Sequence, residues 1–459
     1  MKFLRDKNVP VFITGKEQLE TQDIVRLLQE SERFTNKYKK NKDYYYGKHE
    51  ILSRTFEDPS KPNNRIVTNL PKYICQIRTG YFSSSPLSME CENQNYLNEI
   101  RNVLDYNDFK KTFAELDLYS SVYGHAFLVL YLDDEGEISM SAQKPTDWIL
   151  VRDNTLEQKP RFAIRYYAWW DDVDNTQCYD IELYTKDEII IYEGTPNSLK
   201  EVSRRNHYFG RLPVIEFCEN SSRHGSYEDV IGLIDAYETI LSDSTNTINY
   251  FNDCYLVLEG VEVEEEDILQ MRQNKVMVVP EGCSASFLMK NINETYNKNI
   301  LQEIRENIFV VACCPLLSDS SFSSNSSGVA INYKLYSMEK SIQNKENDFR
   351  KSFNEMFGMI RNILNLKGGK YTVQDKIILT FTRSNPVKDL TAIADAVSKL
   401  GNVVSRKTLL SQLDFVGDVQ MELEAFQREK EEEMDFQIKY MDVYNGELDH
   451  TIEDNNNEE

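Results

Sequence analysis

The chain has 459 residues, of which 41% are hydrophobic and 11% aromatic, and 52 Lys and Arg against 75 Asp and Glu give a formal net charge of −23. This length predicts two to four structural units at roughly 100–200 residues each, and the composition excludes a collagen-like, low-complexity or disulfide-scaffold chain. The charge argues against a conventional nucleic-acid-binding protein, because such proteins present a basic face to the phosphates.

The eight cysteines form no CxxC pair, and none lies at metal-ligand spacing from a histidine. Cys313 and Cys314 are adjacent, which favours neither a metal site nor an ordinary disulfide. We therefore expect reduced, mostly buried thiols. The N-terminus lacks the apolar run of a secretory signal, and no stretch of about 18 apolar residues occurs. A protein that is made and used in the cytoplasm, or in a particle assembled there, is expected.

The first half of the chain predicts an α+β body. Apolar residues at helical spacing indicate helices over 17–50 and 95–120. Between 121 and 216, short β-rich runs are separated by Asp, Asn and Gly, which is typical of an antiparallel sheet. This change of pattern places the sheet after the first helices.

Two segments of this half need separate interpretation. The segment 66–90 predicts a short helix after Pro71, a turn at Gly80 and an extended stretch past Pro86. The stretch KYKKNKDYYYG, residues 37–47, interleaves basic and aromatic residues and so admits stacking on a nucleic acid. The end of a surface helix, with its tyrosines packed against the body, is the favoured interpretation.

The second half predicts two helices that flank a small β unit. In chain order, the predicted elements are a helix from near Ser226 to about 250, strands over 254–260, 274–282 and 285–290, a helix over about 293–314, a Ser-rich stretch over 318–328, a long helix over about 329–366, a strand over 376–386 and helices over 387–434. Two helices that carry a small tip expose apolar seams unless neighbouring subunits cover them, which predicts an oligomer.

Motifs of catalysis are not found. The sequence has no HExxH, no GxSxG and no GxxxxGK[ST]. His125 lies in an apolar run and is expected to be a core residue with satisfied hydrogen bonds. A cation could be bound by the carboxylates of Asp153 or of the pair Asp171 and Asp172. The favoured interpretation is that they are ordinary acidic residues of turns.

Four motifs, spread over about residues 17–430, stand out together. They are Asn64–Pro71 followed by Gly80, Tyr81 and Pro86; Tyr123-Gly124-His125-Ala126-Phe127; Gly210–Phe217 followed by Asp229 and Leu233–Tyr237; and Phe322–Ala330. These segments resemble those of tailed-bacteriophage portal proteins, of the type found in long-tailed phages of Gram-positive bacteria. The fourth motif is the most specific, and Ser84 stands where the family usually has Gly.

The resemblance implies an α+β, portal-like fold, with an α/β wing of antiparallel strands, a two-helix stem, a small β-containing clip, a long wing helix and a helical crown. The implied divisions are 1–225 (N-terminal part of the wing), 226–255 (first stem helix), 256–291 (clip), 292–315 (second stem helix), 316–328 (tunnel loop), 329–386 (long helix and wing return strand), 387–434 (crown) and 435–459 (acidic tail).

The resemblance also implies a function that is structural and not enzymatic. Such proteins form a ring of about twelve subunits at a unique capsid vertex, through which DNA passes during packaging and ejection. The implied partners are other copies of the chain, the large terminase subunit, a head-tail connector or adaptor, the major capsid and scaffolding proteins, and double-stranded DNA that passes without sequence specificity. No cofactor, metal or membrane is implied, and the expected location is the virion, after assembly in the host cytoplasm. The missing P-loop agrees with a separate packaging ATPase, the terminase.

The implied DNA-facing residues are a loop and two helix cations. The tunnel loop comprises Ser318, Asp319, Ser320, Ser321, Phe322, Ser323, Ser324, Asn325, Ser326, Ser327 and Gly328, and the candidate channel-facing basic residues are Lys298 and Arg305. Small uncharged residues suit a loop that follows a moving duplex, because each added cation strengthens phosphate binding. The helix over 226–250, which has five carboxylates and no Lys or Arg, is expected to form a wall that repels DNA. The alternatives are a plain flexible linker for the loop and solvated surface charges for the cations.

Two other classes of function stay open at this point. An enzyme of unrecognised class, hydrolase-like and located in the β-rich half, predicts convergent polar residues in one pocket. A monomeric interaction or scaffold module predicts that the helices over 226–250 and 293–314 form an ordinary hairpin with their apolar faces covered by their own body.

Overall fold

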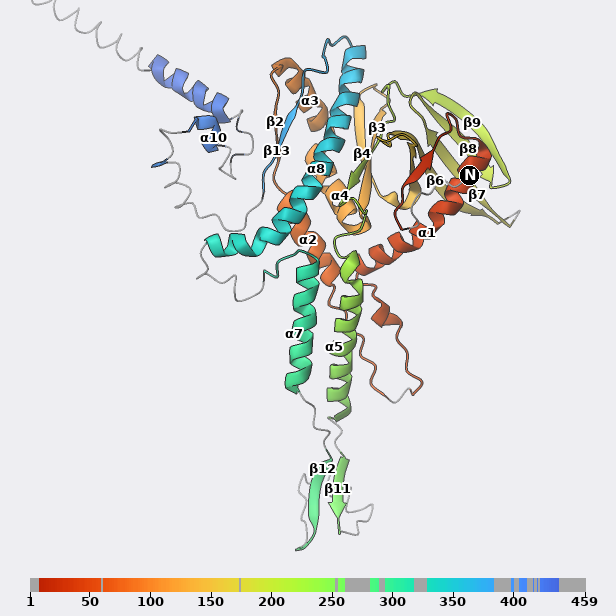
Figure 1. The fold of residues 1–459 in the computed structure, drawn as a ribbon, viewed down its shortest axis with the longest axis vertical. Helices are drawn as coiled ribbons and strands as arrows, with labels where there is room; N and C mark the ends of the chain where they lie inside the picture. The colour runs from red at the N-terminus through yellow and green to blue at the C-terminus, as the bar shows by residue number, and fades with distance from the viewer. Residues whose placement is uncertain are drawn as a thin grey trace, which may run out of the picture. The chain divides into compact units, whose positions relative to one another are not determined.

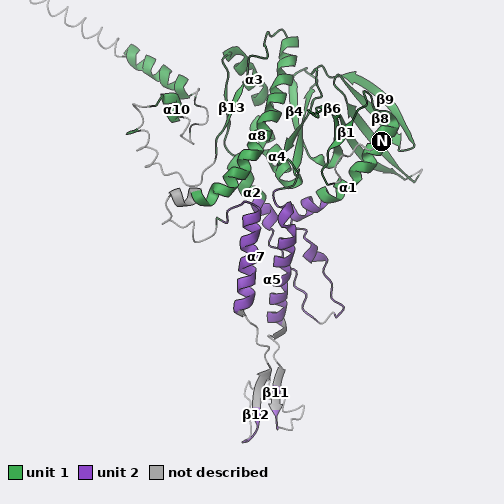
Figure 2. Cartoon of the chain, in the orientation of Figure 1, with its two compact units in different colours: residues 1–38, 75–225, 317–459 green, residues 39–74, 226–316 purple. Residues whose placement is uncertain are grey.

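The computed structural model describes residues 8–58, 61–172, 175–251, 255–260, 281–288, 294–317, 328–383, 398–399, 404–410, 416, 419 and 422–436. The chain divides into two compact units (Figure 2). Unit 1 comprises residues 1–38, 75–225 and 317–459, and unit 2 comprises residues 39–74 and 226–316. Helices and sheets are both present, so the predicted α+β class is confirmed. No helix among the described residues is both long enough and apolar enough to cross a membrane.

A six-stranded sheet in unit 1 has the strand order β1-β5-β6-β7-β8-β9 (Figure 1). Its strands are β1 (Phe12–Thr14), β5 (Trp148–Asp153), β6 (Pro160–Asp171), β7 (Thr176–Tyr184), β8 (Glu188–Thr195) and β9 (Ser198–Asn206). Neighbouring strands are antiparallel except β1 and β5, which are parallel. The predicted antiparallel sheet is thus confirmed, while its parallel edge was not foreseen, because it depends on a partner far away in sequence.

Two smaller sheets complete the strands of unit 1. One has the order β10-β3-β4 and comprises β3 (His125–Leu132), β4 (Ile138–Gln143) and β10 (Val214–Cys218). The other pairs β2 (Leu87–Glu90) antiparallel with β13 (Ile378–Phe381). The predicted strand over 376–386 therefore returns to the first half of the chain, where Leu379 is buried.

Several helices of unit 1 contribute residues to an aromatic core. The described helices of this unit are α1 (Thr21–Tyr45) and α2 (Leu70–Phe82), which both continue across the unit boundary, α3 (Gln94–Tyr106), α4 (Phe109–Tyr123), α8 (Gly328–Leu366) and α10 (Arg406–Leu410), with the 3-10 turn η2 (Pro145–Asp147). Phe349 and Phe353 of α8 are fully buried, and both rings lie 5.0 Å from the ring of Phe217. The apolar stripe of the long predicted helix is therefore core, as expected.

The predicted turn at Gly80 is wrong, because α2 continues through this residue to Phe82. Phe82 is buried and packs edge-on against Phe113 and Phe349, which holds the last turn of the helix in the core. Apart from its chain neighbours and the backbone of its own helix, no heavy atom of the described residues lies within 4 Å of the place that a Cβ at Gly80 would occupy. Glycine at such an open helical position lowers helix propensity by about 1 kcal/mol relative to alanine but does not end a helix that tertiary packing holds.

Gly124 explains the second motif of the sequence. It ends α4 with φ +90°, and a Cβ added there would lie 2.0 Å from the carbonyl oxygen of Arg223. An L-residue would be strained by the backbone angle and would clash with a rigid backbone atom. The chain can therefore turn from α4 directly into β3 only with glycine at this position.

A buried ion network connects α8 to α2, α4 and the segment after β10. The Nζ atom of Lys345 lies 2.5 Å from Asp117 Oδ1 and also contacts Glu219. Arg78 donates to Glu219 at 2.9 Å and to Ser341 Oγ at 3.0 Å. Two cations face two carboxylates, so the buried charges balance. Loss of one partner from such a network would leave an uncompensated buried charge, which is strongly destabilising.

Unit 2 contains the two helices and the small β unit that the sequence predicts. Its elements are η1 (Glu50–Ser53), η3 (Glu228–Val230), α5 (Ile231–Phe251), β11 (Tyr255–Glu259), β12 (Ser284–Leu288) and α7 (Glu294–Val311). α5 and α7 lie side by side and run in opposite directions (Figure 1), and β11 pairs antiparallel with β12. Of the strand predicted over 274–282, residues 281 and 282 lie in a turn, and the others fall outside the described residues.

Candidate functional site

Three buried polar side chains line one face of α5 in unit 2. Glu238, Ser242 and Asn246 are spaced four residues apart, and each accepts a hydrogen bond from a backbone N–H of the extended segment 64–68. The bonds run from Asn64 N to Asn246 Oδ1 at 2.6 Å, from Ile66 N to Ser242 Oγ at 3.0 Å and from Thr68 N to Glu238 Oε1 at 2.8 Å. We call this arrangement the α5 ladder.

The spacing of the α5 ladder follows from backbone geometry. Four residues of an α-helix advance about 6 Å along its axis, and two residues of extended chain advance about 6.6 Å. Alternate N–H groups of the segment 64–68 therefore meet successive turns of α5, and the two run in opposite directions. This register gives a physical reason for the first motif, which supplies an extended run of backbone donors.

His49 supports the Glu238 end of the α5 ladder. Its Nδ1 lies 2.8 Å from Glu238 Oε2, and its Nε2 lies 2.9 Å from the carbonyl oxygen of Tyr44. A carboxylate and a carbonyl only accept hydrogen bonds, so both ring nitrogens donate and the ring is an imidazolium. Burial by itself lowers the pKa of His49, but the bonds to Glu238 and to the Tyr44 carbonyl outweigh it and raise this pKa.

The other carboxylates of this region also bind residues of unit 2. The hydroxyl of Tyr44 donates to Asp235 at 2.5 Å, Arg54 donates to Asp243 at 2.7 Å, and Asn41 donates to Glu228 at 3.1 Å. The expectation that the acids of 226–250 form a wall facing DNA is wrong for Glu238, which is fully buried, and three of the others have donors on the segment 41–54. Asp229 and Asp243 are the exposed members of the five.

Lys298 and Arg305 lie on α7, seven residues apart and therefore on one face of the helix, about 10 Å from each other along its axis. Lys298 is exposed and Arg305 is half-buried. Neither side chain makes a hydrogen bond or an ion pair with any residue that the structure describes. Both cations are thus available to an external anion, and contact with DNA stays a prediction.

Most of the predicted tunnel loop falls outside the described residues. This applies to Ser318, Asp319, Ser320, Ser321, Phe322, Ser323, Ser324, Asn325, Ser326 and Ser327. Gly328 is the first residue of α8, so the long helix begins directly after the Ser-rich stretch. The role of this loop remains a prediction.

Comparison with known proteins identifies the family. A family model described as "Phage portal protein, SPP1 Gp6-like" matches residues 25–435. The chain belongs to this portal protein family. Portal proteins of this family are structural components of the virion, so the resemblance seen in the sequence is confirmed.

Individual relatives agree with this family over most of the chain. The "Portal protein" of Clostridium phage phiCD119 is 25% identical over 419 residues, which cover 85% of this chain and 91% of that protein. The "Portal protein" of Bacillus phage SPP1 is 22% identical over 436 residues, covering 91% and 86%. A chain of the solved structure titled "Neck of empty GTA particle computed with C6 symmetry" matches with a TM-score of 0.43 and 11% identity, covering 74% of this chain and 89% of that one.

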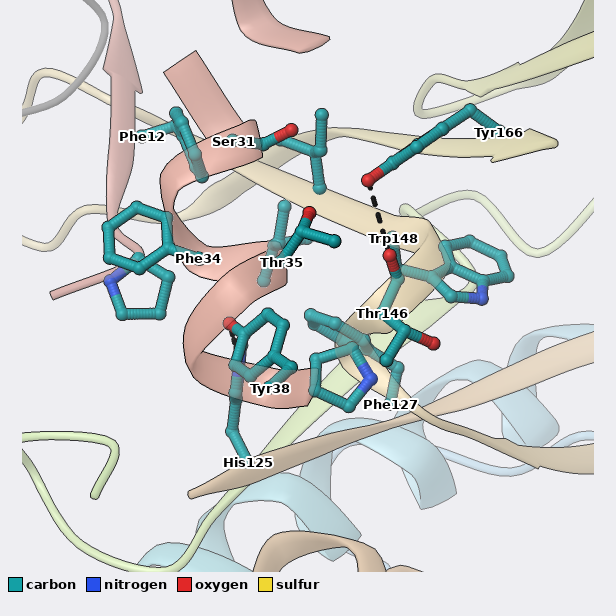
Figure 3. Close-up of a pocket in the computed structure, with 14 residues that line it drawn as sticks. Phe12, Ser31, Phe34, Thr35, Tyr38, His125, Phe127, Thr146, Trp148 and Tyr166 are labelled. Atoms are coloured by element: carbon teal, nitrogen blue, oxygen red, sulfur yellow. Dashed lines mark hydrogen bonds between the residues drawn. The ribbon is translucent and has the colours of Figure 1, made fainter. Parts of the chain in front are cut away.

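One cluster in the β-rich half has the composition of a catalytic relay. The Nδ1 atom of His125 lies 2.7 Å from Glu216 Oε1. Its Nε2 lies 2.7 Å from the hydroxyl of Tyr38, and Figure 3 shows these two side chains. Burial lowers the pKa of His125, so the ring is neutral, donates to Glu216 and accepts from Tyr38. The pocket beside this cluster has a cavity volume of about 10 Å³, room for one water and for no substrate. His125 is therefore a core residue with satisfied hydrogen bonds, as predicted.

A second, larger groove in unit 1 has a volume of about 820 Å³. Its described lining comes from β6, β7, β8 and α8 among others and includes no His, Cys or Ser. Basic and acidic side chains occur there in equal number, so neither charge predominates. Among the described residues, no group of three or more His, Cys, Asp or Glu side chains is placed to hold a metal ion.

The α5 ladder is the feature that sequence reasoning missed. The sequence does contain a signal for it. Glu238, Ser242 and Asn246 are hydrogen-bonding residues spaced four apart, next to the apolar positions of the same predicted helix. Buried polar groups require partners, so this spacing predicts a second chain segment along the helix. Which segment supplies the donors is a long-range property that helical periodicity does not contain.

Replacing Ser242 with Ala removes the acceptor for the N–H of Ile66. We expect the free energy of unfolding, measured by urea denaturation, to fall by about 1–3 kcal/mol, which is the cost of an unsatisfied inward-facing donor. Ser244→Ala on the same helix is the matched control, because Ser244 makes no hydrogen bond through its side chain with the described residues. Helix propensity changes equally in both variants, so equal stabilities of the two would contradict the ladder.

The protonation of His49 predicts a loss of stability at alkaline pH. At pH values above the ordinary histidine pKa near 6.5 but below the raised pKa of folded His49, the folded state keeps a proton that the unfolded state has released. The contribution is therefore fully present below about pH 6.5 and is lost as the pH rises through the folded pKa. We expect the thermal midpoint of the wild type to fall over this window, and that of His49→Gln to lack this component. Parallel pH profiles of the two proteins would sink the assignment.

Proposed function

We propose that this chain is the subunit of a portal ring, and that the ring occupies one capsid vertex and conducts double-stranded DNA during packaging and ejection. The observation that carries the proposal is the family match over residues 25–435. Terminase, a head-tail connector, and capsid and scaffolding proteins are the partners that such a ring requires. The chain itself supplies no P-loop, so the energy for DNA movement comes from the terminase in this proposal.

Exposed apolar side chains in unit 2 support assembly into a ring. Val310 and Val311 at the end of α7 are 71% and 52% exposed, and Ile248 on α5 is 57% exposed. Large apolar side chains left exposed on helices are candidates for contact surfaces. In the proposed ring, neighbouring subunits cover them, whereas a monomeric hairpin would leave them in water.

The proposed division of the chain follows the portal architecture. We assign 1–225 and 329–386 to the wing, 226–255 and 292–315 to the stem, 256–291 to the clip, 316–328 to the tunnel loop, 387–434 to the crown and 435–459 to an acidic tail. α5 and α7 supply the stem in this scheme, and β11 with β12 supplies part of the clip. α8 extends from the tunnel loop into the wing, where the Lys345 network holds it.

The mass of the purified protein in solution tests the ring. A ring of about twelve subunits of 53.6 kDa has a mass of about 640 kDa, and negative-stain images should show a central hole. Light scattering gives the mass without assuming a shape. A mass of one or two subunits, both in solution and after extraction from phage heads, would contradict the proposal.

Charge reversal tests the proposed contact between α7 and DNA. Replacing Lys298 and Arg305 with Glu turns sparse basic positions acidic, and we expect a smaller fraction of DNA-filled heads. The deficit should shrink as salt rises, because ions screen exposed charges. Lys340→Glu on α8 is the control for an exposed helical lysine, and it should package like the wild type. Equal yields in all three strains at low and moderate salt would leave Lys298 and Arg305 as ordinary surface charges.

A further inference from the structure

The β6–β7 hairpin of unit 1 continues as a two-stranded ribbon beyond the rest of its sheet. β5 pairs with β6 only as far as Arg165, and β8 pairs with β7 only from Tyr179 onward. From Trp169 to Asp171 of β6, paired with Thr176–Cys178 of β7, neither strand has another neighbour. We call residues 166–172 and 175–180 the β6–β7 ribbon.

Large aromatic side chains of the β6–β7 ribbon are exposed. Tyr167 is 68% exposed, Trp169 41% and Trp170 56%, whereas Trp148 in the sheet interior is 6% exposed. Tyr167 and Trp169 are two residues apart on one strand and so project from the same face, and Trp170 projects from the other. A two-stranded ribbon gains stability only from what it packs against, so these rings are not explained as core.

The orientation of the Trp169 ring is fixed within the ribbon. Its indole Nε1 donates to Asp180 Oδ1 on β7 at 3.1 Å. Asp180 also stands opposite Tyr167 in the strand register. Two aromatic rings and one carboxylate therefore share the same face of the ribbon. A preset aromatic surface of this kind is typical of the anchors of protein interfaces.

The charge of the ribbon selects the chemistry of its partner. Residues 166–180 include four Asp and no Lys or Arg. A nucleic acid or an anionic membrane would be repelled by these carboxylates, and a second copy of this chain would bring like charges together. A Lys or Arg side chain, by contrast, is attracted both by the faces of the Trp and Tyr rings and by the carboxylates beside them.

We propose that the β6–β7 ribbon is a docking site for a Lys- or Arg-bearing segment of another protein. The cationic side chains lie over Tyr167 and Trp169 and are held there by Asp180 and its neighbours. This contact requires no change in the fold, because the aromatic residues are already exposed and Trp169 is already oriented.

The test uses the full-length protein and a fluorescein-labelled peptide of twelve residues that alternates Lys with Gly. Fluorescence anisotropy at moderate salt gives the dissociation constant. An exposed cation–π contact contributes about 0.5–1 kcal/mol, so Tyr167→Ala and Trp169→Ala should each weaken binding about two- to fivefold. The double variant should weaken it roughly five- to thirtyfold.

Tyr131→Ala is the matched control, because Tyr131 is an aromatic residue on another sheet of unit 1 and is 43% exposed. It should stay within twofold of the wild type. All these variants keep the net charge of −23, so general attraction of the peptide to an acidic protein is the same in each. Their far-UV circular dichroism should be unchanged, since the replaced side chains are exposed.

Three results would overturn the proposal. One is a double variant that binds the peptide as tightly as the wild type does. Another is equal binding of a peptide whose lysines are acetylated, which would show an apolar surface without cation recognition. The third is a change of particle mass in the ribbon variants, which would make the ribbon a contact between copies of this chain. A failure of the ring proposal would show in the mass of the wild type and leave peptide binding unaffected.

Discussion

The α5 ladder constrains unit 2 more than any other contact, because buried polar groups need hydrogen-bond partners. Glu238, Ser242 and Asn246 find theirs on alternate residues of 64–68, where the rise of an extended chain nearly matches one helical turn. A slip of one residue along the segment would place side chains where donors must lie. The ladder therefore fixes both the rotation of α5 about its axis and the face that α5 leaves exposed. Without it, an apolar helix pair would have many nearly equivalent packings.

Buried charge has the same positioning role in unit 1. Lys345 and Arg78 together balance the charges of Asp117 and Glu219 and connect α8 to α2 and α4. The Glu216–His125–Tyr38 chain resembles a catalytic relay in composition, yet the cavity beside it, about 10 Å³ in volume, has no room for a substrate. Although burial opposes it, Arg223 and Arg152 hold the pKa of Glu216 well below its usual range, so this carboxylate stays ionised among its donors. In a structural protein, such networks select one packing among alternatives. Buried ionic groups can do this when each of them has its partner.

Helices and strands of this fold were largely predictable, because their signals are local. The stripe from Phe349 to Leu364 predicted core on α8, and the β-rich runs after residue 121 predicted the sheets. What sequence reasoning did not predict is long-range. Glu238 was interpreted as a charge facing DNA because its partner, His49, lies 189 residues away. The turn at Gly80 was predicted from glycine alone, whereas Phe82 packing into a distant aromatic cluster keeps that helix intact. Local patterns give element type, and tertiary partners decide the role of each polar residue.

The partners of the α5 carboxylates also affect which charged side chains of the helix pair are left to face DNA in a conduit. The wall of a DNA conduit causes little friction when its charged groups do not hold phosphates. At least four of the five acids of 226–250 form hydrogen bonds with side chains of their own unit. On α7, Glu303 and Glu306 are exposed and flank Arg305 in the sequence. Alternation of sign on one helix gives weak net attraction, because each cation that meets a phosphate has a carboxylate close by that opposes binding. A helix of this composition suits a surface over which a polyanion must pass and not remain.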